Sequence, residues 1–140
     1  RRQRQMCIRD RLIAACKQMK IDDLLFITPY VSDVSEHLIE EVNSNGIRTT
    51  VTASFDEKNE ASVARIRPTS LVDAVNELYS GQSAIFISCT NLQTFTIIEE
   101  IEKKCGCICF SSNQVLIWQM LRLAEIDHNL RGYGKLLSKS

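Results

Sequence analysis

The sequence predicts an α/β fold, a four-stranded parallel sheet with helices on both faces. Two observations support this prediction. Short continuous apolar runs, as at residues 24–28 and 84–88, are typical of parallel strands that are covered on both faces. Longer stretches with apolar residues at helical spacing separate these runs, so strands and helices alternate along the chain. Parallel strands joined in this way have right-handed crossovers.

In the first part of the sequence, the spacing of apolar residues predicts one helix before the first strand and one after it. Apolar residues recur at helical spacing before the strand at 24–28, namely Leu12, Ile13, Cys16 and Met19. Pro29 ends that strand, and residues 31–43 predict an amphipathic helix that stops at Asn45-Gly46. The predicted buried stripe of this helix consists of Val34, Leu38, Ile39 and Val42.

The middle of the chain predicts an outer strand and two further helices. Residues 47–53 alternate in polarity and are rich in threonine, which favours a strand near an edge of the sheet. After a polar loop, residues 60–66 predict a short helix that Arg67-Pro68 ends. Residues 69–79 predict an amphipathic helix closed by Gly81.

The last part of the chain continues the alternation of strands and helices. The strand at 84–88 precedes a predicted helix at 92–103, and a strand at 107–110 precedes a predicted helix at 114–124. Residues 12–126 therefore predict a single α/β domain, which is long enough to bury a hydrophobic core. Residues 127–140 are polar and predict a C-terminal tail that ends in a short helix.

The first eleven residues do not fit this pattern. Residues 1–11 lack apolar periodicity and contain five arginines against one aspartate. Residues 6–11 resemble the translation of a transposase adapter from a sequencing library, so we interpret residues 1–11 as a non-native segment. The alternative is a basic arm that binds nucleic acid or membrane. Without this segment the chain has 12 basic and 16 acidic side chains, which predicts no nucleic-acid partner.

Cysteine content and hydropathy indicate a cytoplasmic protein. The chain has six cysteines, and it is long enough to form a hydrophobic core without disulfides. This combination favours a reducing compartment. No apolar stretch approaches ~18 residues and no signal-peptide pattern is present, so we expect no membrane partner. Cys105, Cys107 and Cys109 share one face of a predicted strand, but without a second Cys or His pair they cannot complete a zinc site. No glycine-rich phosphate loop is present, so we expect neither a metal nor a nucleotide cofactor.

The strand predicted at 84–88 delivers Cys89 to its C-terminal tip. The next predicted helix begins close to this thiol, and a helix N-terminus favours a thiolate or a bound carboxylate. In open parallel sheets, ligands bind beyond the carboxyl ends of the strands. The other predicted loops on that rim carry a phenol, hydroxyls and carboxamides but few charges, which suits a small carboxylate. The alternative interpretation of Cys89 is a buried, unreactive cysteine at the end of a strand.

Four short motifs follow one another on this predicted rim, and a fifth closes the chain. They are Thr28-Pro29-Tyr30, Asn59 with Ala64-Arg65-Ile66, Ser88-Cys89-Thr90-Asn91-Leu92-Gln93-Thr94, Ser111-Ser112-Asn113-Gln114 and Gly132-Tyr133-Gly134-Lys135-Leu136-Leu137. In order and spacing, these motifs resemble those of the maleate isomerase and arylmalonate decarboxylase branch of the aspartate/glutamate racemase superfamily. The resemblance extends from about residue 12 to the C-terminus.

This resemblance implies a site as well as a fold. The family has two similar α/β halves that hold substrate between them, and the chain resembles the C-terminal half. By resemblance, Cys89 is a catalytic proton donor and acceptor, whereas Tyr30 and Asn59 bind a substrate carboxylate. Thr90 and Asn91 are implied to complete an anion hole through backbone N–H groups. The resemblance implies no metal, flavin or pyridoxal cofactor, and a homo-oligomer for the full-length parent.

Three hypotheses about function remain open. The first is a cofactor-independent isomerase of the maleate type that acts on a small dicarboxylate. The second is a decarboxylase, a racemase or a relative used in ectoine degradation. The third is a non-catalytic α/β binding module in which Cys89 is unreactive. We expect the chain alone to be inactive and to dimerise or aggregate through the face that would pack on the other half.

Overall fold

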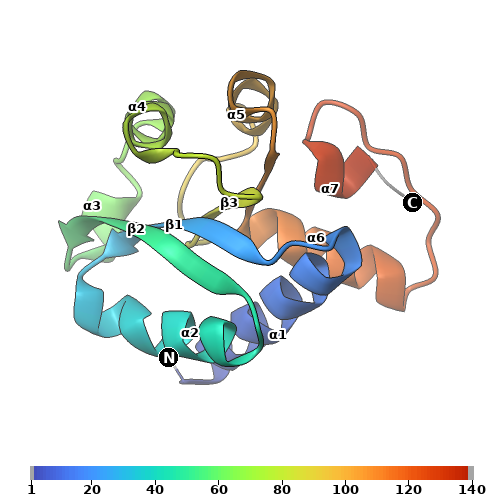
Figure 1. The fold of residues 1–140 in the computed structure, drawn as a ribbon, viewed down its shortest axis with the longest axis horizontal. Helices are drawn as coiled ribbons and strands as arrows, with labels where there is room; N and C mark the ends of the chain where they lie inside the picture. Colours follow the sequence, from blue (N-terminus) through green and yellow to red (C-terminus); the bar gives the residue numbers. More distant parts are fainter. Residues whose placement is uncertain (1, 139–140) are drawn as a thin grey trace.

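The fold is a four-stranded, all-parallel sheet, as predicted. The strands lie in the order β2-β1-β3-β4, and Figure 1 labels the first three of them. It is described by a computed structural model of residues 2–138, with side chains from residue 8 onward. The strands are β1 (Asp23–Tyr30), β2 (Arg48–Glu57), β3 (Ala84–Ile87) and β4 (Ile108–Ser111). The predicted fold class is therefore confirmed.

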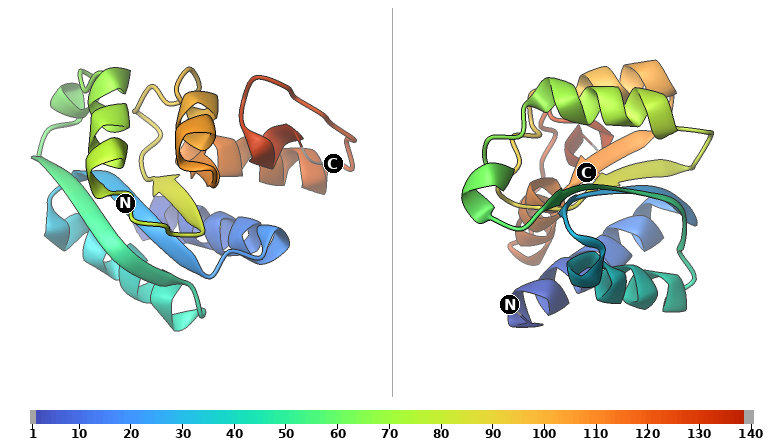
Figure 2. Two further views of the ribbon diagram at one scale, coloured as in Figure 1. Left: turned by 45° about the horizontal axis from the view of Figure 1, so that its top comes forward. Right: turned by 90° about the vertical axis from the view of Figure 1, so that its left-hand side faces the viewer.

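Helices cover both faces of the sheet, as the two views of Figure 2 show. The helices α3 (Glu60–Val63), α4 (Pro68–Leu78) and α5 (Ile98–Cys105) pack on one face. On the other face lie α1 (Arg2–Met19), α2 (Ser32–Ser44), α6 (Ser112–Leu123) and α7 (Lys135–Ser138). Six of the predicted elements, β1, β3, β4, α2, α4 and α6, begin and end within two residues of their predicted bounds.

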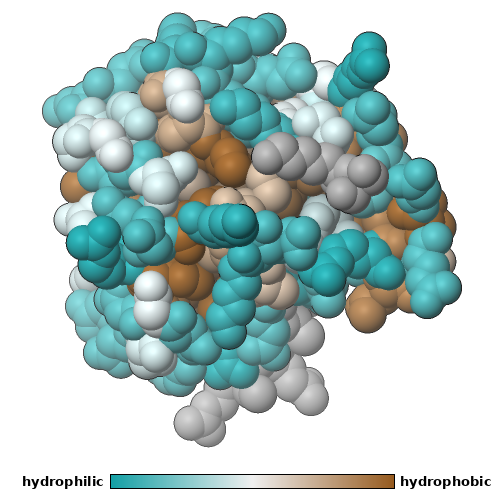
Figure 3. Space-filling model, turned by 45° about the vertical axis from the view of Figure 1, so that its right-hand side comes forward, coloured by the Kyte–Doolittle hydropathy of each residue, from teal (hydrophilic) through white to brown (hydrophobic). Residues whose placement is uncertain are grey.

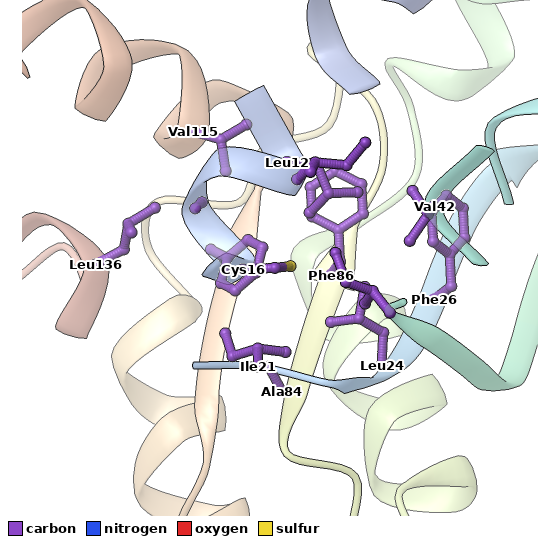
Figure 4. Close-up of a cluster of buried hydrophobic side chains, with 14 of the residues drawn as sticks. Leu12, Cys16, Ile21, Leu24, Phe26, Val42, Ala84, Phe86, Val115 and Leu136 are labelled. Atoms are coloured by element: carbon purple, nitrogen blue, oxygen red, sulfur yellow. The ribbon is translucent and has the colours of Figure 1, made fainter. Parts of the chain in front are cut away.

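Each face of the sheet supports its own hydrophobic core. Phe26, Phe86 and Phe110 stand in register on neighbouring strands, with ring centroids 5.4 and 5.7 Å apart. Figure 4 shows Phe26 and Phe86 together with Leu12 and Cys16 of α1. The alternate strand residues form the opposite core under α4 and α5, including Leu25, Ile27, Ile85, Ile87 and Cys109. Burial on both faces explains why these strands are continuous apolar runs.

Two strands of the sheet extend further than the sequence predicts. β2 lies at the edge of the sheet, as expected, but it continues to Glu57. β1 continues through Pro29 to Tyr30 instead of ending at the proline. Pairing between β1 and β2 is irregular between Thr28 and Tyr30, and pairing with β3 ends at Ile27. Because the pairing is interrupted there, the strand can include Pro29, which has no N–H to donate.

The prediction of a helix from residue 92 was wrong at its start, because α5 begins only at Ile98. The preceding segment forms turns that direct Leu92, Thr94 and Ile97 into the interior. The Thr94 hydroxyl, fully buried, donates to Ser111 Oγ at 2.9 Å, and the Ile97 N–H donates to the Thr94 carbonyl. Threonine side chains that find such partners compete with helix formation.

The first helix, α1, runs without interruption from Arg2 to Met19. Ile8 packs against the core, and Arg9 Nη1 lies 3.3 Å from Glu41 Oε2. The interpretation of residues 1–11 as non-native concerns their origin and stays a prediction. Residue 1 and the side chains of residues 2–7 lie outside the described part of the chain.

The C-terminal segment folds back onto the core. Leu136 and Leu137 of α7 are fully buried among the side chains of the α1 face. Large apolar side chains remain exposed between residues 120 and 133 (Figure 3), namely Met120, Leu123, Ile126, Leu130 and Tyr133. Within residues 2–138, no helix has the length and apolarity needed to cross a membrane.

Candidate functional site

Cys89 lies at the carboxyl end of the sheet, directly beyond β3, with 5% of its surface exposed. The Ser88 N–H donates to the Ile27 carbonyl at 2.7 Å, which continues the β1–β3 ladder up to the cysteine. Tyr30, at the end of the neighbouring strand, places its hydroxyl 3.3 Å from Cys89 Sγ. The Asn91 N–H donates to the same sulfur at 3.3 Å. The thiol is therefore held between a phenol and a backbone amide.

A pocket of about 350 Å³ opens above this sulfur. Strand tips and the turn after β3 form its polar side, and α1 and α2 add apolar side chains. Its lining residues are Ile8, Thr28, Tyr30, Val34, Ser35, Leu38, Glu60, Ser88, Cys89, Thr90 and Asn91. Among the described side chains that line the pocket, Glu60 alone is charged.

Glu60 is a site residue that the sequence analysis missed. It is the first residue of α3, and both of its carboxylate oxygens accept from the Tyr30 hydroxyl at 3.2 Å. Glu60 Oε2 also accepts from Asn91 Nδ2 at 2.6 Å. An acidic residue at a helix start resembles an ordinary solvated side chain. Its position on the predicted rim, immediately after Asn59, was the only indication in the sequence.

Four of the five predicted site residues line the pocket, and Asn59 does not. Cys89, Tyr30 and Asn91 are in direct contact, whereas Thr90 is exposed and its carbonyl accepts from Asn113 Nδ2 at 3.0 Å. The exposed Asn59 uses its Oδ1 to accept from the Ala61 N–H at 2.8 Å, which caps α3. A substrate-binding role for Asn59 therefore stays a prediction.

The environment fixes the protonation state of Tyr30. Burial raises the pKa of the Tyr30 phenol above its ordinary value, and the hydrogen bond to Cys89 and the nearby Glu60 carboxylate raise it further. The phenol therefore stays protonated at neutral pH and can donate a hydrogen bond. The sequence predicted that a helix N-terminus would lie beside the Cys89 thiol, and this prediction was wrong. Because α5 begins only at Ile98, the N–H group near the thiol comes from the turn at Asn91.

The other cysteines whose side chains the structure describes, Cys16, Cys105, Cys107 and Cys109, belong to the packing. Burial raises the pKa of Cys16 to about 12 and raises that of Cys109 well above its ordinary value, so both thiols stay protonated. Cys105 and Cys107 also have raised pKa values, caused first by burial. In the described part of the chain, no three His, Cys, Asp or Glu residues are grouped so that they could hold a metal ion.

Comparison with known proteins identifies the family. The model of the arylmalonate decarboxylase family matches residues 5–137. The chain belongs to this family. Maleate isomerases group with it in the aspartate/glutamate racemase superfamily, so the resemblance noted in the sequence is confirmed.

Relatives in this family are similar over most of the chain. It is 29% identical over 117 residues to arylmalonate decarboxylase from Bordetella bronchiseptica, which covers 81% of this chain and 49% of that protein. It is 22% identical over 129 residues to maleate isomerase from Geobacillus stearothermophilus, which covers 91% of this chain and 51% of that protein. The chain thus spans about half the length of the curated relatives it matches.

The fold matches one half of a solved maleate isomerase. The crystal structure of a cysteine-to-alanine variant of the maleate isomerase Iso from Pseudomonas putida S16, with maleate, superposes with a TM-score of 0.90 at 19% identity. The match covers 94% of this chain and 53% of that chain. The parallel sheet described above is therefore the fold of one half of such an enzyme.

Proposed function

We propose that this chain is the C-terminal half of a cofactor-independent cysteine isomerase that acts on a small dicarboxylate, as maleate cis-trans isomerases do. The observation that supports the proposal best is the setting of Cys89 Sγ, 3.3 Å from both the Tyr30 hydroxyl and the Asn91 N–H. The Asn91 N–H donates to the sulfur and so stabilises its thiolate form, whereas the Tyr30 hydroxyl, whose own proton goes to Glu60, helps to fix the position of the sulfur. A thiol that both gives and takes a proton needs that support.

The proposed reaction uses Cys89 for proton transfer only. A thiolate from the other half adds to one alkene carbon of the cis dicarboxylate, and the Cys89 thiol gives its proton to the neighbouring carbon. The former double bond is then single and rotates. The Cys89 thiolate removes a proton from the same carbon while the other thiolate leaves, which restores the double bond in the trans form. Tyr30, Thr90 and Asn91 are the groups proposed to bind carboxylate oxygens while negative charge develops on them.

A direct test uses the full-length parent with maleate and follows the olefinic protons of the product by NMR. Because general acid–base groups contribute about 10²–10⁴-fold to rate, we expect Cys89→Ala to lower kcat by about that factor. Cys105→Ser, which changes a half-buried thiol outside the pocket, is the matched control and should keep its activity. Undiminished turnover by Cys89→Ala would contradict the assigned role.

Decarboxylation is the second candidate function, because the matching family model is that of arylmalonate decarboxylase and identity to that enzyme is 29%. In this reaction, loss of CO₂ from a malonate leaves an enediolate, and Cys89 protonates its carbon. Assaying the parent with phenylmalonate and with maleate distinguishes the two. A cysteine in the corresponding loop of the first half favours isomerisation or racemisation, and a glycine favours decarboxylation.

A non-catalytic binding module is the remaining alternative. It predicts that Cys89 is alkylated by iodoacetamide only as slowly as an unperturbed thiol, whose pKa is about 8.5. The proposed function predicts rapid alkylation of Cys89 at neutral pH. Peptide mapping by mass spectrometry separates Cys89 from Cys16, Cys107 and Cys109, which lie outside the pocket and should remain unlabelled.

A further inference from the structure

The carboxylate of Glu60 accepts hydrogen bonds from two side chains beside the sulfur of Cys89. Its two oxygens take both the Tyr30 hydroxyl and the Asn91 side-chain N–H, at 3.2 and 2.6 Å. Tyr30 Oη lies 3.3 Å from Cys89 Sγ, so Tyr30 connects the Glu60 carboxylate to the thiol. These contacts link residues that lie 30 and 31 positions apart in the sequence.

The chemistry of the pair selects a carboxylate. Tyr30 stays protonated and Asn91 presents its Nδ2, so both groups donate toward the same point. Two donors that converge in this way bind the two oxygens of a carboxylate and offer nothing to an ammonium group. Glu60 therefore stands where one carboxylate of a substrate would have to lie.

We propose that Glu60 is an internal carboxylate that fills the substrate-carboxylate subsite of the pocket and that a dicarboxylate must displace it in order to bind. This inference rests on the proposed function, because it takes the substrate to be a small dicarboxylate. Glu60 then acts as a specificity determinant. Only a ligand that can replace the contacts of Glu60 to Tyr30 and Asn91 would then bind.

The setting of Glu60 allows it to leave. Its side chain is exposed, and it begins a helix of only four residues. The start of that helix is capped by Asn59 Oδ1 on the Ala61 N–H, which does not involve the Glu60 side chain. Exposed side chains change rotamer within nanoseconds, so displacement requires no change in the fold. If Glu60 stayed in place, its charge would repel an incoming dianion at short range.

A binding experiment on the 140-residue chain tests this proposal. Maleate is titrated into ¹⁵N-labelled chain, and the Asn91 side-chain amide and the Cys89 backbone amide report its binding by NMR. Glu60→Gln keeps the size and an acceptor oxygen but removes the charge. An internal competitor has an effective concentration in the millimolar range, so we expect Glu60→Gln to bind maleate about tenfold more tightly than the unchanged chain. Glu77→Gln, which removes an exposed carboxylate from α4 outside the pocket, should leave the affinity unchanged.

Each outcome decides the proposal. Tighter binding by both Glu60→Gln and Glu60→Ala, with an unchanged Tm, supports it. Unchanged or weaker maleate binding in both variants, or no maleate binding by any variant, overturns it. Binding of ethylammonium by the unchanged chain and not by Glu60→Gln also overturns it, because Glu60 would then be a cation ligand. The isomerase proposal fails on a different measurement, the turnover of the full-length parent with Cys89→Ala, so the two failures are distinguishable.

Discussion

Two glutamates in this molecule accept hydrogen bonds in opposite settings. Glu60 is exposed at the rim of the sheet, and its donors are the side chains of Tyr30 and Asn91. Glu102 of α5 is 6% exposed, and its donors are backbone N–H groups. It accepts from Cys109 at 3.0 Å and from Lys135 at 3.1 and 3.0 Å.

The difference shows how burial separates a structural carboxylate from one available for function. Glu102 joins α5, β4 and α7, and removing it would leave the buried N–H of Cys109 and the half-buried N–H of Lys135 without this acceptor. Glu60 holds two side chains that water or a ligand can also satisfy, so its loss affects the pocket more than the fold. The region around Glu102 should therefore respond to mutation in stability, and the region around Glu60 should respond in binding.

The largest effect is expected at Gly134, beside Glu102. A Cβ there would lie 2.5 Å from Ile98 Cγ2 and 3.2 Å from Gln114 Nε2, and the φ of Gly134 is +88°. Overpacking and left-handed strain together should lower the free energy of unfolding of Gly134→Ala by about 2–4 kcal/mol, measured by urea denaturation.

Gly132 provides the matched control for this substitution. Its φ is +92°, but a Cβ would meet no atom within 4 Å. Gly132→Ala should therefore show only the backbone effect, about 1–2 kcal/mol. Equal losses in the two variants would show that the packing of Gly134 against α5 contributes nothing.

The comparison of the two glutamates is tested next by Glu102→Ala and Glu60→Ala. Leaving buried N–H groups unsatisfied should make Glu102→Ala about 2 kcal/mol less stable than the unchanged chain. A surface change such as Glu60→Ala should stay within about 0.5 kcal/mol. Thermal and urea unfolding of both variants give the measurement. A larger loss at Glu60 than at Glu102 would reverse our assignment of the two roles.

Much of the fold could be predicted from the sequence because local patterns and tertiary packing agree. Continuous apolar runs in β1 and β3 and helical periodicity in α2 and α4 lie where the sheet buries them. The start of α5 could not be predicted, because it depends on Thr94 donating to Ser111, 17 residues away. No local pattern contains a hydrogen bond between the turns that follow β3 and the last residue of β4.

The candidate site was predicted in part for the same reason. Cys89 and Tyr30 end neighbouring strands, so parallel topology brings them together. Asn59 and Glu60 are adjacent in the sequence, and only the path of the chain into α3 decides which of them faces the pocket. The N-cap geometry directs Asn59 to the backbone of α3 and leaves Glu60 to reach Tyr30.

Asn59 itself gives the next smaller prediction. Losing the cap of α3 should make Asn59→Ala about 1 kcal/mol less stable, whereas Asn59→Asp keeps an acceptor oxygen and should keep the stability. Maleate titration of Asn59→Asp then examines the predicted substrate role separately. Unchanged affinity for maleate would mean that Asn59 only caps α3. Weaker affinity in a fully stable variant would support contact between Asn59 and the ligand.

The smallest effect concerns pH, and its sign follows from Glu102. Burial raises the pKa of Glu102 above its ordinary value of 4.5, although the N–H bonds from Cys109 and Lys135 lower it in part. The folded chain therefore binds this proton more tightly than the unfolded chain. Between the raised pKa and 4.5, the contribution of Glu102 to stability grows as the pH falls, and it is lost as the pH rises through the folded value.

The measurement is the difference in unfolding free energy between the unchanged chain and Glu102→Gln, followed from pH 7 down to pH 4.5. The glutamine cannot titrate, so subtraction removes the contributions of the other carboxylates that both chains share. We expect the unchanged chain to gain on the variant as the pH falls. The opposite slope would mean that the N–H groups of Cys109 and Lys135 outweigh burial and hold Glu102 ionised.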